Sequence, residues 1–97
     1  MTAIQQALLA LIAVAGGDAV AAQEHVARAQ RDARAAARRE RQIVEIAALV
    51  IAGHRERAEG LSREHAVEFP GDTELLAYVS GQLGQRPFRA QTDEESR

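Results

Sequence analysis

The chain contains no cysteine, tryptophan or lysine, and aromatic residues make up only 3% of it. The lack of cysteine excludes a disulfide framework, a thiolate metal site and a cysteine nucleophile. Because aromatics are so rare, the core must be built from Ala, Leu, Ile and Val, and this composition favours close-packed helices over a sheet. No segment alternates apolar and polar residues as a half-buried strand does. The 97 residues suffice for one small domain.

Arginine supplies all twelve basic residues, which we interpret as the codon usage of a GC-rich bacterial genome. Residues 7–15 are all apolar and resemble the apolar part of a signal peptide. Residues 1–6 carry no basic side chain, however, and Gly16-Gly17-Asp18 interrupts the apolar pattern. A membrane-spanning helix needs about 20 apolar residues, which is more than this run provides. We therefore expect a cytoplasmic protein that has no membrane contact.

Apolar residues recur at spacings of three and four along most of the chain, which predicts helices. Glycine at 16, 17 and 53 and the Pro70-Gly71 pair mark the expected helix ends. The predicted fold is all-α, a short array of antiparallel helix pairs without a sheet. Its five helices are expected at residues 3–15, 18–34, 38–52, 55–69 and 73–83. Residues 1–84 form the expected domain, and residues 85–97 form a polar, acidic tail that we expect to be disordered.

The two halves of the chain share an internal repeat with an offset of 36 residues. Gly17 with Ala22 recurs as Gly53 with Ala58. Helix–turn–helix units with a period near 34 are the signature of tetratricopeptide repeats, and the chain resembles this family. Gly53 matches the family's tight turn, Ala58 its helix crossing and Pro70 the end of its unit. The Trp and Tyr usual in the family's first helix are absent.

Three segments carry a narrower resemblance, and they read R-R-E-R-Q-I-V-E, G-H-R-E-R-A and H-A-V-E-F-P-G-D. They are similar to the divergent subfamily named for tetratricopeptide repeat protein 38, over about residues 30–76. The resemblance implies an α-helical repeat scaffold without a defined set of catalytic residues. The Thr expected before the first segment is Ala37 here, so the helix over 38–52 lacks its usual N-cap. An alternative fold is therefore one continuous helix over residues 18–52, packed in a dimeric bundle.

The residues that could carry chemistry do not form a reactive pattern. No two of His25, His54 and His65 have the i, i+4 spacing that places two imidazoles together on a helix for metal binding. No hydroxyl residue lies in a glycine loop or a strained turn. The carboxylates of residues 55–68 alternate with arginines, as on a solvated helix face. We expect no catalytic residues, no metal and no cofactor, so the chain is not predicted to be an enzyme.

Arginines at steps of three or four form a winding stripe on the predicted second and third helices. Its members are Arg28, Arg31, Arg34, Arg38 and Arg41. Residues 28–41 hold six arginines and two acidic residues, a net charge of +4. An acidic protein segment or a nucleic acid would suit this charge. The overall charge of −2 and the scarcity of stacking aromatics favour a solvated face or a protein contact over nucleic acid.

The first predicted helix is apolar around its whole circumference, so its neighbours in a short array would leave part of it in water. We expect this helix to make a self-association contact, most simply in a two-fold dimer. The residues predicted for that contact are Ile4, Leu8, Leu11 and Ile12. The intrachain alternative is that the helix over 73–83 covers it.

These features together predict a non-catalytic protein–protein interaction module or a small accessory subunit of an enzyme complex. The alternative is a nucleic-acid-associated regulatory protein that uses the basic stripe of residues 28–41. The sequence does not identify the partner.

Overall fold

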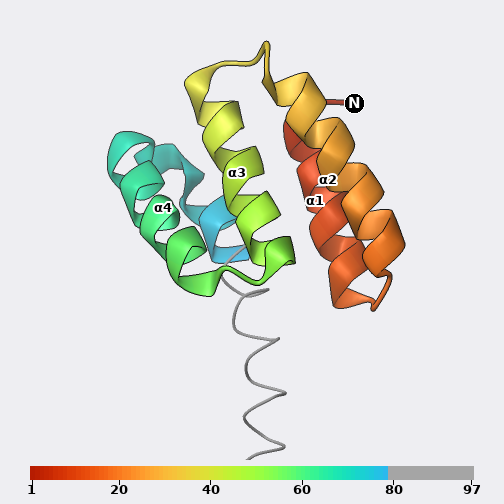
Figure 1. Ribbon diagram of the computed structural model, residues 1–97. Helices are drawn as coiled ribbons and strands as arrows, with labels where there is room; N and C mark the ends of the chain where they lie inside the picture. The colour runs from red at the N-terminus through yellow and green to blue at the C-terminus, as the bar shows by residue number, and fades with distance from the viewer. Residues whose placement is uncertain (79–97) are drawn as a thin grey trace, which may run out of the picture.

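The computed structural model describes residues 1–78, and within them every regular element is helical (Figure 1). The elements in chain order are α1 (Ala3–Ala15), α2 (Ala19–Ala33), α3 (Arg38–Ala52), α4 (Arg55–Glu68) and the 3₁₀ turn η1 (Pro70–Asp72). The predicted all-α fold is confirmed, and the first four predicted helices agree with these bounds to within one residue. Residues 73–78 are helical as well. The rest of the helix predicted over 73–83, the domain boundary at 84 and the tail over 85–97 lie outside the described residues.

Local side chains fix the beginnings of the first two helices. Thr2 forms a capping box with Gln5: the Thr2 hydroxyl accepts a hydrogen bond from the Gln5 amide at 3.1 Å, and the Gln5 side chain accepts one from the Thr2 amide at 2.8 Å. Asp18 caps α2 by accepting from the Ala21 amide at 3.0 Å. These bonds satisfy backbone donors that have no partner within the helix.

The turn inside each helix pair repeats in space as it does in the sequence. Gly17 and Gly53 both adopt a left-handed backbone, with φ values of 84° and 85°. The next residue closes each turn: the Asp18 amide donates to the Ala13 carbonyl, and the His54 amide donates to the Leu49 carbonyl, both at 2.9 Å. Because only glycine adopts this backbone without strain, the spacing of 36 residues marks two equivalent helix–turn–helix units.

The chain is not helical at residues 34–37, so the predicted separation of the second and third helices is confirmed and the alternative of one long helix over residues 18–52 is wrong. Ala37 takes an extended backbone, with φ −69° and ψ 165°, and has no side-chain cap. Two hydrogen bonds stabilise the turn instead. The Ala36 amide donates to the Ala33 carbonyl, and an Arg41 guanidinium nitrogen donates to the Ala36 carbonyl. The break lets the apolar faces of both α2 and α3 pack on α1, which outweighs the helix propensity of the alanines.

The core lies between the two helix pairs. In Figure 1 the α1–α2 pair stands beside the α3–α4 pair, and α3 packs against α1, α2 and α4. Ala22 and Ala58, which lie one repeat apart, are completely buried, as expected for small residues at a helix crossing. Leu76, in the helical segment after η1, joins the same core cluster. Among residues 1–78 we find no helix with the length and apolar character needed to span a bilayer.

Candidate functional site

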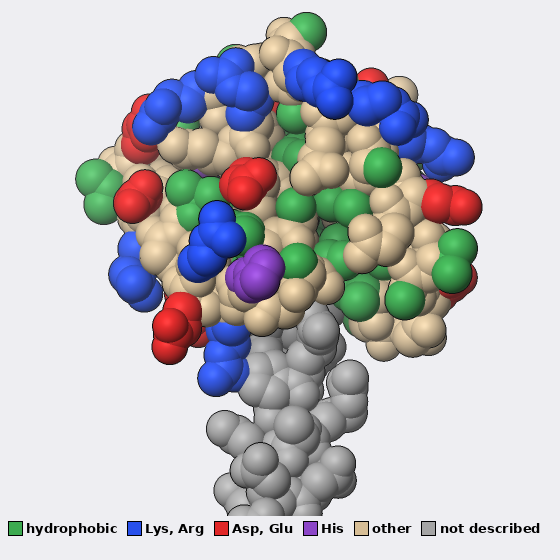
Figure 2. Space-filling model, viewed as in Figure 1, with side chains coloured by type: hydrophobic (Ala, Val, Ile, Leu, Met, Phe, Trp, Pro, Cys, Tyr) green, Lys and Arg blue, Asp and Glu red, His purple; other side chains and the backbone are tan. Residues whose placement is uncertain are grey.

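The five arginines of the predicted stripe lie together at one edge of the molecule. Their side chains are exposed, and Figure 2 shows a band of basic side chains along the upper edge, where α2 ends and α3 begins. The α2–α3 turn brings them together because it reverses the chain in the middle of the stripe (Figure 1). We call this surface the arginine edge, and its members are Arg28, Arg31, Arg34, Arg38 and Arg41.

The arginines contributed by α3 are engaged within the chain. The Arg38 guanidinium pairs with the Glu68 carboxylate at 2.7 Å, although both side chains remain largely in water. Arg41 donates to the Ala36 carbonyl across the α2–α3 turn. Arg38 therefore ties α3 to α4, and Arg41 stabilises the turn.

The arginines contributed by α2 are not engaged in this way. Within residues 1–78, Arg28, Arg31 and Arg34 form no ion pair and no side-chain hydrogen bond. Arg28 and Arg31 lie on α2 and Arg34 is its C-cap residue, and we refer to these three as the α2 arginines. They are separated by three residues each, so they lie on neighbouring positions of the same side of the helix. Their guanidinium groups are available to an anionic partner.

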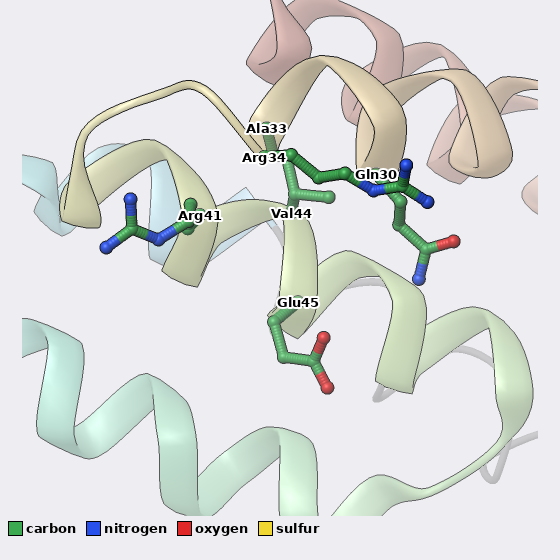
Figure 3. A pocket seen from close by; sticks show the side chains of 6 residues that line it. All are labelled: Gln30, Ala33, Arg34, Arg41, Val44 and Glu45. Atoms are coloured by element: carbon green, nitrogen blue, oxygen red, sulfur yellow. The ribbon is translucent and has the colours of Figure 1, made fainter.

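A shallow groove of about 340 Å³ opens beside the α2 arginines, between α2 and α3 (Figure 3). Its floor is apolar, because Ala33 and Val44 are only 5% and 2% exposed. The remaining lining residues are Gln30, Arg34, Arg41 and Glu45. Figure 3 shows the Arg34 side chain extending toward Gln30, whereas Arg41 points to the opposite side and Glu45 lies below Val44. The groove can accept a small apolar side chain with charged groups around it.

A buried polar cluster joins α3, α4 and η1, and the sequence did not reveal it. His65 is completely buried. Its Nδ1 lies 2.7 Å from the Gln42 amide oxygen, and its Nε2 lies 2.6 Å from the Asp72 carboxylate. The Phe69 ring packs against it, with ring centroids 4.8 Å apart. The Gln42 amide nitrogen donates to Glu68 at 3.4 Å, which turns the amide oxygen toward His65.

Asp72 is the centre of this cluster. Its carboxylate is 8% exposed and accepts hydrogen bonds from Arg39 Nε and Nη2, at distances of 2.6 to 3.0 Å, as well as facing His65. Two-point contact between guanidinium and carboxylate is among the strongest side-chain interactions. We call Arg39, Gln42, His65 and Asp72 the junction network, because it holds η1 against both helices of the second unit.

The first unit has no such network. At the repeat offset of 36 residues, Arg39, His65 and Asp72 correspond to three alanines. These alanines are Ala3, Ala29 and Ala36. Ala3 and Ala29 are buried and Ala36 is half-buried, so small apolar side chains fill the equivalent junction of the first unit. Polar residues in the second unit thus stand where the first unit has alanines. This difference was the signal in the sequence that could have revealed the network.

The junction network and the Arg38–Glu68 pair predict a stability that falls in acid. Hydrogen bonds from Arg39 lower the pKa of the Asp72 carboxyl below its usual value of 3.8, and the hydrogen bond from Arg38 lowers the pKa of Glu68 below 4.5. A folded-state pKa below the unfolded one stabilises the fold at every pH above the unfolded value. That contribution disappears as the pH falls through the unfolded value toward the folded one.

We therefore expect the urea midpoint of unfolding to be steady from pH 7 to pH 5 and to drop between pH 5 and pH 3. The variant Asp72→Asn should show a smaller drop over the same range, because it has one carboxylate fewer to protonate. A drop of equal size in Asp72→Asn and in the unsubstituted chain would contradict the assignment to Asp72.

The other residues considered for chemistry are dispersed. His25 Nδ1 lies 3.1 Å from the Gln6 amide oxygen, His54 is an exposed turn residue, and His65 is sealed in the core. Within residues 1–78 no three of the His, Asp and Glu side chains come close enough together to hold a metal ion.

The residues predicted for self-association occupy different environments on α1. Ile4 and Leu8 are half-buried, and Ile12 is 56% exposed. Leu11 is completely buried in the core of the same chain. Of these four residues only Ile12 is exposed, and Leu11 does not reach the surface.

Comparisons of the chain with protein-family models, with curated proteins and with solved structures gave no match.

Proposed function

We propose that the chain is a non-catalytic protein-interaction module whose arginine edge binds an acidic segment of a partner protein. The observation that carries this proposal is the set of α2 arginines, which are exposed and have no intrachain partner within residues 1–78. One of them, Arg34, lines a groove with an apolar floor. Charge around a small apolar contact is the usual composition of a transient protein interface.

The repeated architecture supports a scaffold role. Two helix–turn–helix units at an offset of 36 residues pack side by side, and a stack of such units exposes extended surfaces for partners. We propose that the chain is a tetratricopeptide-like repeat protein of the cytoplasm, related to the divergent subfamily named above. It would serve as a scaffold or as an accessory subunit.

The alternative hypothesis is that the arginine edge binds a nucleic acid. Single-stranded nucleic acids are held by aromatic side chains that stack on the bases. Tyr78 and Phe69 are the only aromatic side chains of the Phe, Tyr or Trp type within residues 1–78, and neither is part of the arginine edge. The structure therefore favours carboxylates over stacked bases as ligands.

We also propose that the protein forms a homodimer through α1. Ile12 is exposed, and the half-buried Leu8 and Ile4 lie one and two turns before it on the helix. Sedimentation equilibrium at micromolar concentration should report twice the monomer mass, and Ile12→Glu should reduce it to the monomer. A monomeric mass for the unsubstituted chain would refute the dimer.

Fluorescence anisotropy with a labelled Glu-rich peptide tests the acidic partner. The double variant Arg31→Glu/Arg34→Glu should bind at least about tenfold more weakly, since it replaces two attractions by repulsions. The control is Arg57→Glu, which reverses an exposed arginine on α4 away from the edge. Equal losses in both variants would show nonspecific charge attraction. Tighter binding of single-stranded RNA or DNA than of the peptide would support the alternative hypothesis of a nucleic-acid partner.

A further inference from the structure

We infer that the groove beside the arginine edge selects a partner segment of mixed charge: an acidic block followed by a basic residue. The inference rests on the proposed function, and it adds the sign of the charge that is expected at each end of the bound segment. The acidic block would face the α2 arginines, and the basic residue would face Glu45.

The groove is polarised because its cations and its carboxylate lie on different sides of its floor. Arg34 and Arg41 border it near the α2–α3 turn, and Glu45 follows Arg41 by one turn of α3 (Figure 3). Two charges at this spacing on a helix would ordinarily pair with each other. Arg41 instead donates to the Ala36 carbonyl, and Figure 3 shows it pointing away from Glu45.

Glu45 is left exposed and without an ion pair within residues 1–78. A uniformly acidic ligand that binds the arginines would place a carboxylate near Glu45 and be repelled there. A ligand with Lys or Arg at that point would gain an attraction. Like charges facing each other are a common means by which interfaces reject wrong partners.

The distance along α3 between the end of the groove at the α2–α3 turn and Glu45 sets the length of the expected motif. One helical turn is about 5.4 Å, which an extended segment spans in about two residues. The residue between the acidic block and the basic residue would then lie over the apolar floor formed by Val44 and Ala33. A small aliphatic residue fits that position, so the motif has three acidic residues, then Ala or Val, then Lys or Arg.

Binding of three labelled peptides tests this motif. All three share the sequence E-E-E-V, and the fifth residue is Lys, Gln or Glu. Anisotropy titrations at low ionic strength should rank the affinities Lys over Gln over Glu, with about a tenfold difference between the Lys and Glu peptides. The variant Glu45→Gln should remove most of that difference, and Glu45→Lys should reverse the ranking.

The control variant is Glu64→Gln, an exposed carboxylate on α4, and it should keep the original ranking. Circular dichroism should show that every variant retains the helical fold. An unchanged ranking in Glu45→Gln would overturn the inference while leaving the acidic partner intact. If no peptide binds, or if Arg31→Glu/Arg34→Glu binds all three as the unsubstituted chain does, the proposed function and the inference both fail.

Discussion

Replacing Asp72 by alanine is expected to lower the free energy of unfolding by about 3 kcal/mol, because the change leaves a completely buried imidazole and a guanidinium without their shared acceptor. Water can solvate Arg39, whose side chain is 43% exposed, but it cannot reach His65. The main cost therefore arises at His65, which would retain only Gln42 as a polar partner. For a domain of this size the melting temperature should fall by more than about 10 °C. Urea unfolding followed by circular dichroism measures the loss.

The matched control for this substitution is Asp18→Ala. Asp18 is also an acidic residue next to a helix, but it is exposed and only caps α2. Its removal should cost about 1 kcal/mol, as is typical of an N-cap. A loss at Asp72 no larger than the loss at Asp18 would mean that the junction network contributes nothing beyond ordinary capping.

The helix bounds were predictable because their signals are local. Gly17 and Gly53 end their helices with a left-handed backbone and Pro70 follows the end of α4, and the apolar spacing between them defines the faces that pack. The break between α2 and α3 is different, since residues 34–37 contain only arginine and alanine, which favour a helix. The resemblance to a repeat family predicted the break there, whereas local helix propensity supported the long helix that proved wrong.

The junction network could not be predicted from its residues taken one at a time, and the reason is physical. Arg39 and Asp72 are 33 residues apart, and each, taken alone, has the character of a surface residue. His65 follows Glu64 on a helix with many charges, so its neighbours gave no sign of burial. Only the packing of η1 against α4 brings the Asp72 carboxylate within hydrogen-bond distance of both His65 and Arg39. A polar side chain is buried at low cost only when its hydrogen-bonding partners are buried with it. An argument made for one residue at a time therefore predicts that each of these side chains is exposed.

The sequence predicted which residues form the arginine edge, but it did not predict which of them pair with other groups of the chain. Steps of three and four residues place the arginines on neighbouring helix positions in any helical structure. Which of them have intrachain partners depends on where Glu68 and the Ala36 carbonyl lie after folding. Within residues 1–78 the structure leaves Arg28, Arg31 and Arg34 without an intrachain ion pair, and the proposed binding role therefore rests on these three arginines.

Replacing Ile46 by alanine should be as damaging as the loss of Asp72, at about 3 kcal/mol, because it opens a cavity in the middle of the core. Ile46 is completely buried on α3, and it lies one repeat after the equally buried Ala10 of α1. The first unit accommodates a methyl group where the second has a branched side chain. Thermal and urea unfolding at micromolar concentration measure the loss.

The control Ile12→Ala removes the same atoms from the exposed face of α1 and should cost less than about 1 kcal/mol in the monomer. Its stability must therefore be measured over a range of protein concentrations. If a second copy covers Ile12, the unfolding midpoint of the unsubstituted chain will rise with concentration, and the midpoint of Ile12→Ala will not, because only a folded dimer is stabilised by mass action. A large, concentration-independent loss in Ile12→Ala would instead place Ile12 in the intrachain core. The Ile46 loss should be present at every concentration, because the cavity lies within one chain.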